Sequence, residues 1–260
     1  MDWMAISSRN LFVECPINGQ KNNTMKKVIG VDGCRYGWCA AILEYKKAKI
    51  ELFRSFEELA KWAFPAQRVW VDIPIGLGNK EIQRNVENQM RALLKPVRHT
   101  SVFNTPVRPA VYERNYDYAK KVHFDHTGQF ISVQSWGICQ KIKEVDQFLI
   151  RNKTDRDIIR ESHPELCFSW WNESKPLPYA KSTSDGISLR MNLLRNHIEN
   201  FDQVYENALD RFPRKAVQRH DILDALILMV NAQRSLEEIE NRLVNTPAFD
   251  EHDIKMEVVY

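Results

Sequence analysis

Two short apolar runs in this chain each end in an aspartate, and the segment between them limits how they can pair. The runs are "VIGVD", which ends at Asp32, and "RVWVD", which ends at Asp72. Both are rich in β-branched and aromatic residues, which is typical of strands buried on both faces of a sheet. The chain between them is long enough for two further strands and a helix. This order predicts neighbouring parallel strands within an α/β fold.

The segment between the two aspartates is expected to be a meander followed by a helix. "WCAAILEY" and "KIELFRSF" predict a second and a third strand, set apart by the turn-forming stretches "GCRYG" and "YKKA". "SFEELAKWA" predicts a short helix capped by Ser55, with Glu58 three residues later completing a capping box. We therefore expect three antiparallel strands, a helix, and a fourth strand parallel to the first.

Asp32 and Asp72 are expected at the same end of the sheet. Neighbouring strands lie about 4.8 Å apart, so the two carboxylates would need either a shared proton or a cation. Asp224 lies in "HDILDALILMV" among apolar residues, and a buried charge without a partner is costly. Asp221 shares its helix face three residues earlier. If this helix crosses the strand ends, the four acids can surround one cation site.

Carboxylates from two strands and one helix are hard oxygen ligands, which bind Mg²⁺ or Mn²⁺. Two such ions can activate water and stabilise the leaving oxygen of a phosphodiester. The pattern therefore predicts a metal-dependent nuclease with a two-metal-ion mechanism. Structural alternatives stay open, because Asp32 beside a glycine also suits a turn, and Asp72 before Ile-Pro also suits a structural strand end. Asp221 equally suits the start of a helix as an N-cap.

A long helical segment is expected between the fourth and fifth strands. "NKEIQRNVENQMRALL" has helical spacing from Asn79 to about Leu94, with a basic outer face that includes Arg84 and Arg91. "SVQSWGICQKIKEVDQFLIRN" has the apolar stripe of a second helix. We interpret residues of about 79–155 as a helical insertion within one domain.

The C-terminal half is expected to complete the sheet and add helices. "DIIRESHPELCFSWW" predicts the fifth strand, interrupted at Pro164, and helices follow near residues 185–211. "HDILDALILMVNAQRS" is the clearest helix in the sequence. A second capping box at Ser235 and Glu238 predicts a helix over "LEEIENRL", and "IKMEVVY" alternates like an edge strand. The expected fold is a mixed five-stranded sheet flanked by helices.

The composition indicates an ordinary globular protein but does not identify its binding partner. Residues 1–24 show no sustained periodicity, which predicts a disordered leader or an upstream extension before a single domain over 25–260. The net charge of +3 permits nucleic-acid binding without requiring it. Because no apolar run approaches roughly 18 residues, we expect a cytoplasmic protein without a membrane partner. Five scattered cysteines without C-x-x-C spacing are expected to be buried free thiols.

The order of the motifs resembles the ribonuclease H-like superfamily. "DILDALILMV" is similar to the last acidic motif of the Holliday-junction resolvases. Taken in order, "GVDGCRYGW", "VDIPIGL", "SVF", "SVQSWGICQKIKEVD", "ESHPELCF" and "HDILDA" resemble a family of predicted RNase H-like nucleases classed as a domain of unknown function. The resemblance runs from about Met25 to the C terminus. It implies an RNase H-like fold, a nucleic-acid substrate and two bound Mg²⁺ or Mn²⁺ ions.

The resemblance also implies roles for individual acids. Asp32 and Asp72 match the metal-binding acids of the first and fourth strands, and Asp224 or Asp221 matches the acid of the last helix. Glu165, in the H-P-E segment, matches an additional ligand or a group that positions a base. A bend at the adjacent proline is the structural alternative for this segment.

Four basic residues are candidates for contacting substrate phosphates, namely Arg84, Arg91, Lys141 and Lys181. The two arginines are seven residues apart and nearly on one helix face, so a solvated basic face is the alternative. Both lysines lie in segments similar to the family. The chain departs from the family pattern R-x-C-D-x-x-A-R, because "RNVENQMR" has Glu87 where the family has aspartate.

Two other functions are compatible with these residues. One is a non-catalytic binding module on an RNase H-like frame, in which the basic helix binds nucleic acid or a protein. The other is a phosphotransferase of the actin-like or sugar-kinase type, with "GVDGCRYGW" as its phosphate loop. That fold also needs a second phosphate loop and a glycine-rich adenosine site, and the nine glycines of the chain form neither pattern.

Overall fold

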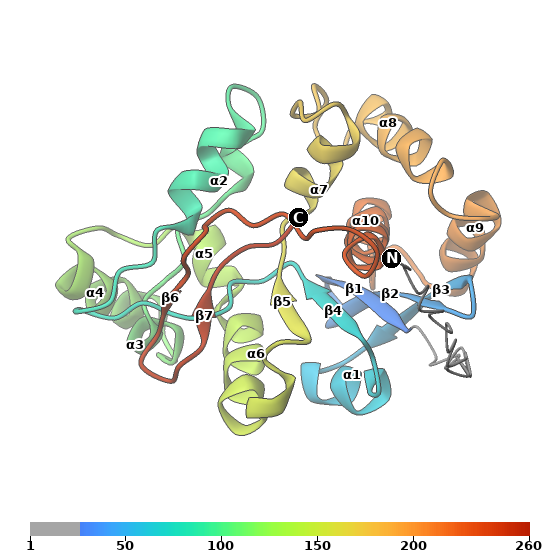
Figure 1. The fold of residues 1–260 in the computed structure, drawn as a ribbon. Coiled ribbons are helices and arrows are strands. Elements are labelled where there is room, and N and C mark those ends of the chain that lie inside the picture. Colours follow the sequence, from blue (N-terminus) through green and yellow to red (C-terminus); the bar gives the residue numbers. More distant parts are fainter. Residues whose placement is uncertain (1–26) are drawn as a thin grey trace, which may run out of the picture.

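The computed structural model describes residues 27–260, so the predicted leader over 1–24 lies outside the described residues. Within the described range, five strands form one mixed sheet in the order β3-β2-β1-β4-β5 (Figure 1). Its strands are β1 (Val28–Gly33), β2 (Trp38–Glu44), β3 (Lys47–Phe53), β4 (Arg68–Val71) and β5 (Ile159–Glu161). The first three are antiparallel, and β4 and β5 run parallel to β1. The predicted mixed five-stranded sheet of RNase H-like arrangement is confirmed.

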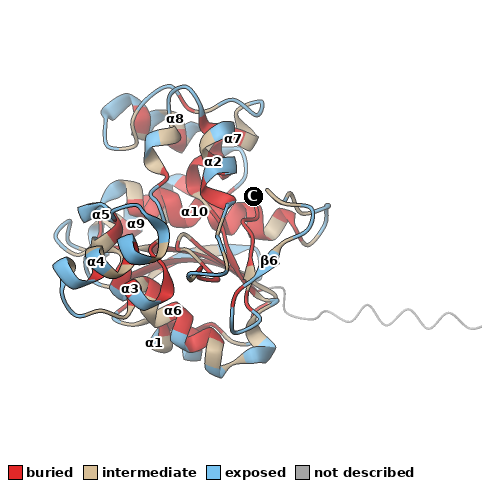
Figure 2. Cartoon of the chain, turned by 90° about the vertical axis from the view of Figure 1, so that its left-hand side faces the viewer, coloured by how far each residue is buried: buried red, intermediate tan, exposed pale blue. Residues whose placement is uncertain are grey.

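Helices cover both faces of the sheet (Figure 1). One face packs against α7 (Pro164–Trp171), α8 (Ser184–Arg195), α9 (Phe201–Arg211) and α10 (Arg219–Arg234). The other face packs against α1 (Phe56–Ala63) and α6 (Cys139–Arg151). Figure 2 shows that α10 and the sheet are the most continuously buried parts of the molecule. β1 is therefore buried on both faces, as its unbroken apolar run predicts.

Gly30 sets how closely α10 approaches β1. A Cβ atom at this position would overlap the backbone of α10 at the carbonyl oxygen of Ala225 and the amide nitrogen of Met229. Glycine is the residue that allows two backbones to approach this closely. The contact places the middle of α10 over β1, which brings Asp224 towards the strand ends.

Helices fill the chain between β4 and β5, as expected. They are α2 (Val86–Leu94), the 3₁₀ helix η1 (His99–Ser101), α3 (Arg108–Val111), α4 (Tyr116–Thr127), α5 (Val133–Gly137), α6, and the 3₁₀ helix η2 (Lys153–Asp155). The buried guanidinium of Arg108 joins α3 to α6 and to the C-terminal segment through Asp146 and Asp250, with nitrogen–oxygen distances of 2.8 and 2.5 Å. Buried charges paired in this way hold the helical segment against the rest of the domain.

The helix predicted to begin at Asn79 begins only at Val86. The side-chain oxygen of Asn79 accepts hydrogen bonds from the amides of Glu81 and Ile82, which forms a turn in place of a helical start. Arg84, five residues after Asn79, points inward and donates to the backbone carbonyls of Ile75 and Gly76. Residues 79–85 therefore form a loop, although their apolar spacing is that of a helix.

Two further expectations were wrong. The region around Pro164 is not an interrupted strand, because β5 ends at Glu161 and Pro164 opens α7 as its first residue, a position that needs no amide donor. Ser235 does not cap a new helix. Its hydroxyl donates to the carbonyl of Ala232 at the end of α10, and Glu238 pairs with Arg234 of the same helix.

The C-terminal segment adds less strand than its alternation predicts. β7 (Lys255–Met256) pairs with β6 (Ala248–Phe249), and Val259 forms an isolated parallel bridge with Ser162 beyond the end of β5. The four cysteines within residues 27–260 are buried and free, which agrees with the prediction for them. In the same range no helix has the length and apolar character needed to span a membrane.

Candidate functional site

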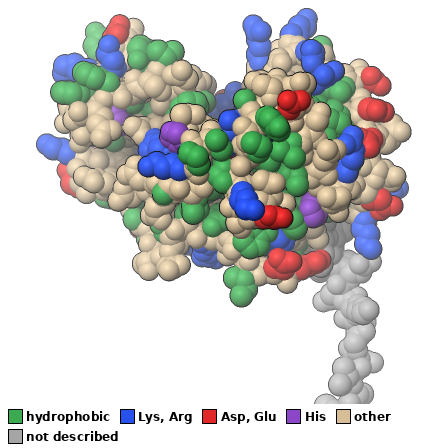
Figure 3. Space-filling model, turned by 90° about the horizontal axis from the view of Figure 1, so that it is seen from above, with side chains coloured by type: hydrophobic (Ala, Val, Ile, Leu, Met, Phe, Trp, Pro, Cys, Tyr) green, Lys and Arg blue, Asp and Glu red, His purple; other side chains and the backbone are tan. Residues whose placement is uncertain are grey.

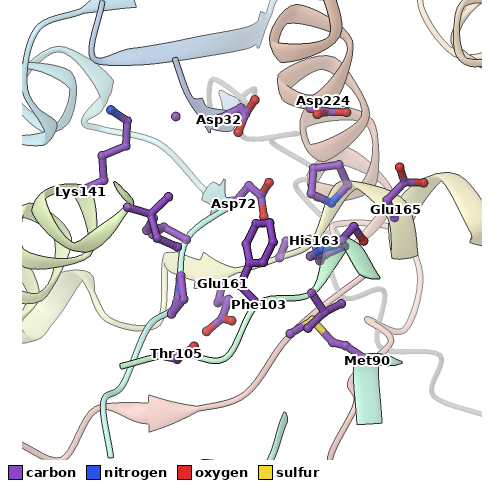
Figure 4. Close-up of a pocket in the computed structure, with 18 of the residues that line it drawn as sticks. Asp32, Asp72, Met90, Phe103, Thr105, Lys141, Glu161, His163, Glu165 and Asp224 are labelled. Carbon is purple, nitrogen blue, oxygen red and sulfur yellow. The ribbon is translucent and has the colours of Figure 1, made fainter. Parts of the chain in front are cut away.

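A pocket of about 470 Å³ opens at the carboxyl ends of β1 and β4. Its acidic residues come from separate elements, so only the tertiary fold brings them together (Figure 4). They are Asp32, Asp72, Glu87, Glu161, Glu165 and Asp224. Polar and basic groups (Lys141, His163, Lys181) and an apolar wall (Met90, Val102, Phe103, Ile138) complete the lining. The size is within the range of small-ligand sites, roughly 300–1,000 Å³.

Asp32 and Asp72 lie side by side because of the parallel register of their strands. Val31 pairs with Val71, and the amide of Asp72 donates to the carbonyl of Val31 at 2.9 Å. Asp32 is 6% exposed. Among residues 27–260, no side chain or amide donates a hydrogen bond to either carboxylate. The predicted juxtaposition of these two acids is present in the structure.

The electrostatics of this pair reflect burial and crowding. Burial raises the pKa of Asp32 well above its ordinary value, and the charges of Asp224 and Asp72 raise it further while Lys181 opposes them. Burial likewise raises the pKa of Asp72 to about 7, with Lys181 acting in the opposite direction. These carboxylates therefore lie where additional positive charge is stabilising.

Asp224 is 1% exposed and projects from α10 into the same pocket. Its Oδ2 atom accepts a hydrogen bond from Nζ of Lys181 at 2.6 Å. Lys181 comes from the loop between α7 and α8, and its side chain is 42% exposed. Burial lowers the pKa of Lys181, but the nearby carboxylates outweigh burial and raise it above the ordinary value. Lys181, predicted to contact substrate phosphates, is thus the cation that balances the acidic cluster.

Asp221 does not line the pocket. Its Oδ2 accepts the amide of Gln218 at 2.8 Å, which forms a capping box at the start of α10. Its Oδ1 lies 3.3 Å from Nε2 of His220. The N-cap of α10 is Gln218, three residues before the N-cap position considered from the sequence, and Asp221 completes the capping box as the third residue of the helix.

Glu165 lies in the first turn of α7 and is held by a fully buried arginine. Nη2 of Arg190 is 2.5 Å from Oε1 of Glu165, while Oε2 is buried with no hydrogen-bond partner among the described residues. Burial raises the pKa of Glu165, and Arg190 opposes this shift. Beside it, burial lowers the pKa of His163 to about 4, so the imidazole is neutral at pH 7.

Arg84 is buried, which corrects its predicted place on a solvated basic face. Its Nη2 is 2.5 Å from Glu161 and its Nε is 2.6 Å from Glu87, and it also donates to two backbone carbonyls. Burial raises the pKa of Glu161 to about 7 despite the ion pair with Arg84. Glu87, at the position of the family aspartate, uses its carboxylate to bind Arg84 and Thr105.

The other two predicted phosphate contacts lie in different settings. Arg91 donates to the carbonyl of Val102 and to the side chain of Asn104, so it holds the loop that follows η1. Lys141 of α6 lines the pocket, with its Nζ 5.6 Å from the ring centroid of Trp38. Among the described residues it forms no ion pair.

Sequence reasoning missed Glu161 and Arg190. Glu161 ends β5, next to β4, as Asp32 and Asp72 end or follow their strands. The same strand-end pattern could have identified it. Nothing in the local sequence marks Arg190, because its role depends on α8 lying against α7.

The donor set fits a divalent cation by its chemistry. Asp32, Asp72 and Asp224 offer hard carboxylate oxygens from three elements, and mutual repulsion contributes to the raised pKa of Asp32. As the side chains stand, no three His, Cys, Asp or Glu residues within 27–260 are grouped closely enough to hold a metal ion. Asp224 is paired with Lys181 in this arrangement.

Comparison with known protein families places the chain in one of them. A profile described as "Protein of unknown function (DUF429)" matches residues 30–248. The chain belongs to the DUF429 family. No curated protein and no solved structure matches it. The match extends from residue 30 to residue 248 and therefore includes every acid that lines the pocket of this DUF429 protein.

Proposed function

We propose that this DUF429 protein is a metal-dependent nuclease that hydrolyses phosphodiester bonds at the pocket bounded by β1, β4 and α10. One observation carries the proposal. Asp32 and Asp72 are set level by adjacent parallel strands, face a pocket, and receive no hydrogen bond from the residues that the structure describes. Buried acids that serve structure alone are normally paired. Acids left open in a pocket are characteristic of a site that binds a cation.

The residues have separate roles in this proposal. Asp32, Asp72 and Asp224 would hold Mg²⁺ or Mn²⁺, two ions being expected, which when bound supply charge stabilisation and activate water. Lys181 stabilises Asp224 when no ion is bound, because its ammonium lies 2.6 Å from the carboxylate. Lys141 also lines the pocket and contributes a positive charge suited to a phosphate group. Arg190 fixes the orientation of Glu165 at the edge of the site.

The surface is compatible with a polyanionic substrate. Seen from above, Lys and Arg side chains stand on both sides of a notch, while acidic side chains gather mainly on the right-hand part (Figure 3). Charges of both signs are therefore interspersed on this face. A net charge of +3 gives modest attraction for nucleic acid, so we expect binding that weakens strongly with salt.

The contacts favour a nuclease over the two alternatives. A binding module with structural acids would be expected to pair Asp32 and Asp72 with donors, and none is found within residues 27–260. A phosphotransferase would use the loop after β1 to bind phosphate. That loop bonds internally through Cys34 and Gly37, and the amide of Tyr36 donates to Ala216. The amides of Cys34, Tyr36 and Gly37 are thus engaged within the protein.

Metal binding tests the proposal directly. We expect Mn²⁺ to bind the wild-type protein and to bind Asp32→Asn and Asp72→Asn at least tenfold more weakly, as measured by calorimetry. Asp221→Asn is the matched control, because Asp221 lies on the same helix as Asp224 but outside the pocket. Cleavage of single-stranded and duplex oligonucleotides is then followed with and without Mn²⁺. Unchanged Mn²⁺ affinity in both pocket variants would refute the proposal.

A further inference from the structure

Phe103 is a large aromatic side chain exposed at the wall of the acidic pocket. It is 42% exposed, and it lines the pocket together with Asp72 and His163. Figure 4 shows its ring in the same space as these two residues, close to the strand ends. Single exposed apolar side chains are common on protein surfaces, so what distinguishes this ring is its place on the wall of a pocket that also contains carboxylates.

The loop that carries Phe103 is held in place from both sides. The guanidinium of Arg91 donates to the carbonyl of Val102 at 3.2 and 3.3 Å, and it also bonds Asn104. On the other side, the hydroxyl of Thr105 donates to Glu87, which is itself bound to Arg84. The backbone next to Phe103 is therefore fixed while the ring remains exposed. A ligand that binds the ring therefore does not have to order this loop.

The pocket is lined by apolar side chains as well as by buried carboxylates. Met90 and Val102 belong to one buried apolar cluster and line the pocket together with Phe103. Asp32 and Asp224 are only 6% and 1% exposed. A reacting phosphate must enter the pocket to approach these carboxylates. An intact duplex is too wide for a pocket of about 470 Å³, whereas a single strand can place one nucleotide inside.

We propose that the substrate is single-stranded nucleic acid, with one base stacked on Phe103 and the adjacent phosphodiester directed towards Asp32 and Asp72. This inference rests on the proposed nuclease function and specifies its substrate. Stacking on an aromatic side chain is tolerant of base identity and typically contributes about 5- to 150-fold in affinity per base. Lys141 supplies positive charge on the same side of the pocket as Ile138.

Binding in EDTA separates stacking from metal chemistry. Fluorescence anisotropy is measured for labelled single-stranded DNA, single-stranded RNA, a blunt duplex, and an abasic single strand of equal length. The proteins are wild type, Phe103→Ala, Phe103→Trp, and the control Phe249→Ala, whose ring is 48% exposed on β6 outside the pocket. We expect Phe103→Ala to weaken single-strand binding at least fivefold, with Phe103→Trp and Phe249→Ala close to wild type.

The abasic strand gives the decisive comparison. If the ring stacks on a base, Phe103→Ala has no further effect on binding of a strand that lacks bases. An equal loss on the abasic strand, or duplex bound as tightly as single strands, overturns the inference. Preference between the DNA and RNA arms identifies which nucleic acid is used. Loss of Mn²⁺ binding in Asp32→Asn with no effect of Phe103→Ala overturns the stacking role alone. A base-dependent effect of Phe103→Ala in a protein that binds no Mn²⁺ overturns the nuclease function alone.

Discussion

Replacing Asp72 with asparagine is expected to remove much of the pH dependence of folding in the metal-free protein. The substitution keeps the size of the side chain and removes its charge. In the folded protein the pKa of Asp72 is raised from 3.8 to about 7, chiefly by burial. The folded state therefore holds this proton more tightly than the unfolded state does. The stabilisation is fully present below pH 4 and is lost as the pH rises through about 7.

The size of the effect follows from the shift. A difference of about three pKa units corresponds to about 4 kcal/mol. Asp72 is partly open to the pocket, and water there reduces the penalty for its charge, so we expect 2–4 kcal/mol, an order-of-magnitude range. Between pH 4.5 and pH 8, the wild-type protein should lose about this much more stability than Asp72→Asn. At pH 8 without metal, the variant should be the more stable protein.

Urea unfolding in EDTA at pH 4.5, 6 and 8 measures this difference. Asp117→Asn on α4 is the control, since its side chain is 84% exposed. Adding Mn²⁺ at pH 8 should stabilise the wild-type protein and leave Asp72→Asn nearly unchanged, because an ion that binds only the folded state shifts unfolding by mass action. Parallel pH profiles for wild type and Asp72→Asn would refute the assignment of a buried, crowded carboxylate at this position.

Three further substitutions test other parts of the structure. Gly30→Ala should cost about 3 kcal/mol or more in urea unfolding, because its Cβ would overlap the backbone of α10; a loss below about 1 kcal/mol contradicts this packing. Arg84→Ala should destabilise the fold by about 3–5 kcal/mol, since it leaves two buried glutamates without their partner; a phosphate-binding role alone predicts normal stability. Lys181→Met should bind Mn²⁺ about tenfold more tightly in calorimetry, because the ammonium no longer competes for Asp224; weaker binding would show that Lys181 assists the ion.

Local sequence patterns were sufficient to predict the first four strands and the acids at the ends of β1 and β4. Period and composition identified β1 to β4, and the parallel pairing of β1 with β4 placed Asp32 beside Asp72. A strand that is buried on both faces of a sheet needs an unbroken apolar run, and such a run can be recognised in the sequence alone. Apolar spacing also predicted a helix over residues 79–85, and this prediction was wrong. The side chain of Asn79 accepts backbone hydrogen bonds and forms a turn in place of a helical start.

The partners of the charged residues were decided by tertiary structure. Sequence spacing placed Arg84 on a helix surface, yet a loop carries it to Glu161, which is 77 residues away. The buried pair of Arg190 and Glu165 likewise depends on α8 packing against α7. Charges are satisfied by whatever lies nearest in space, and local periodicity carries no information about such distant neighbours.

The sequence by itself therefore determined the sheet, its central strands and the two strand-end acids. It did so because strand period and burial are local properties of the chain. Only the tertiary structure decided that Lys181 balances Asp224, that Asp221 caps α10, and that Phe103 stands exposed above the acids. These outcomes depend on how α10 and the loops close over the sheet, which is set by packing between segments far apart in the chain.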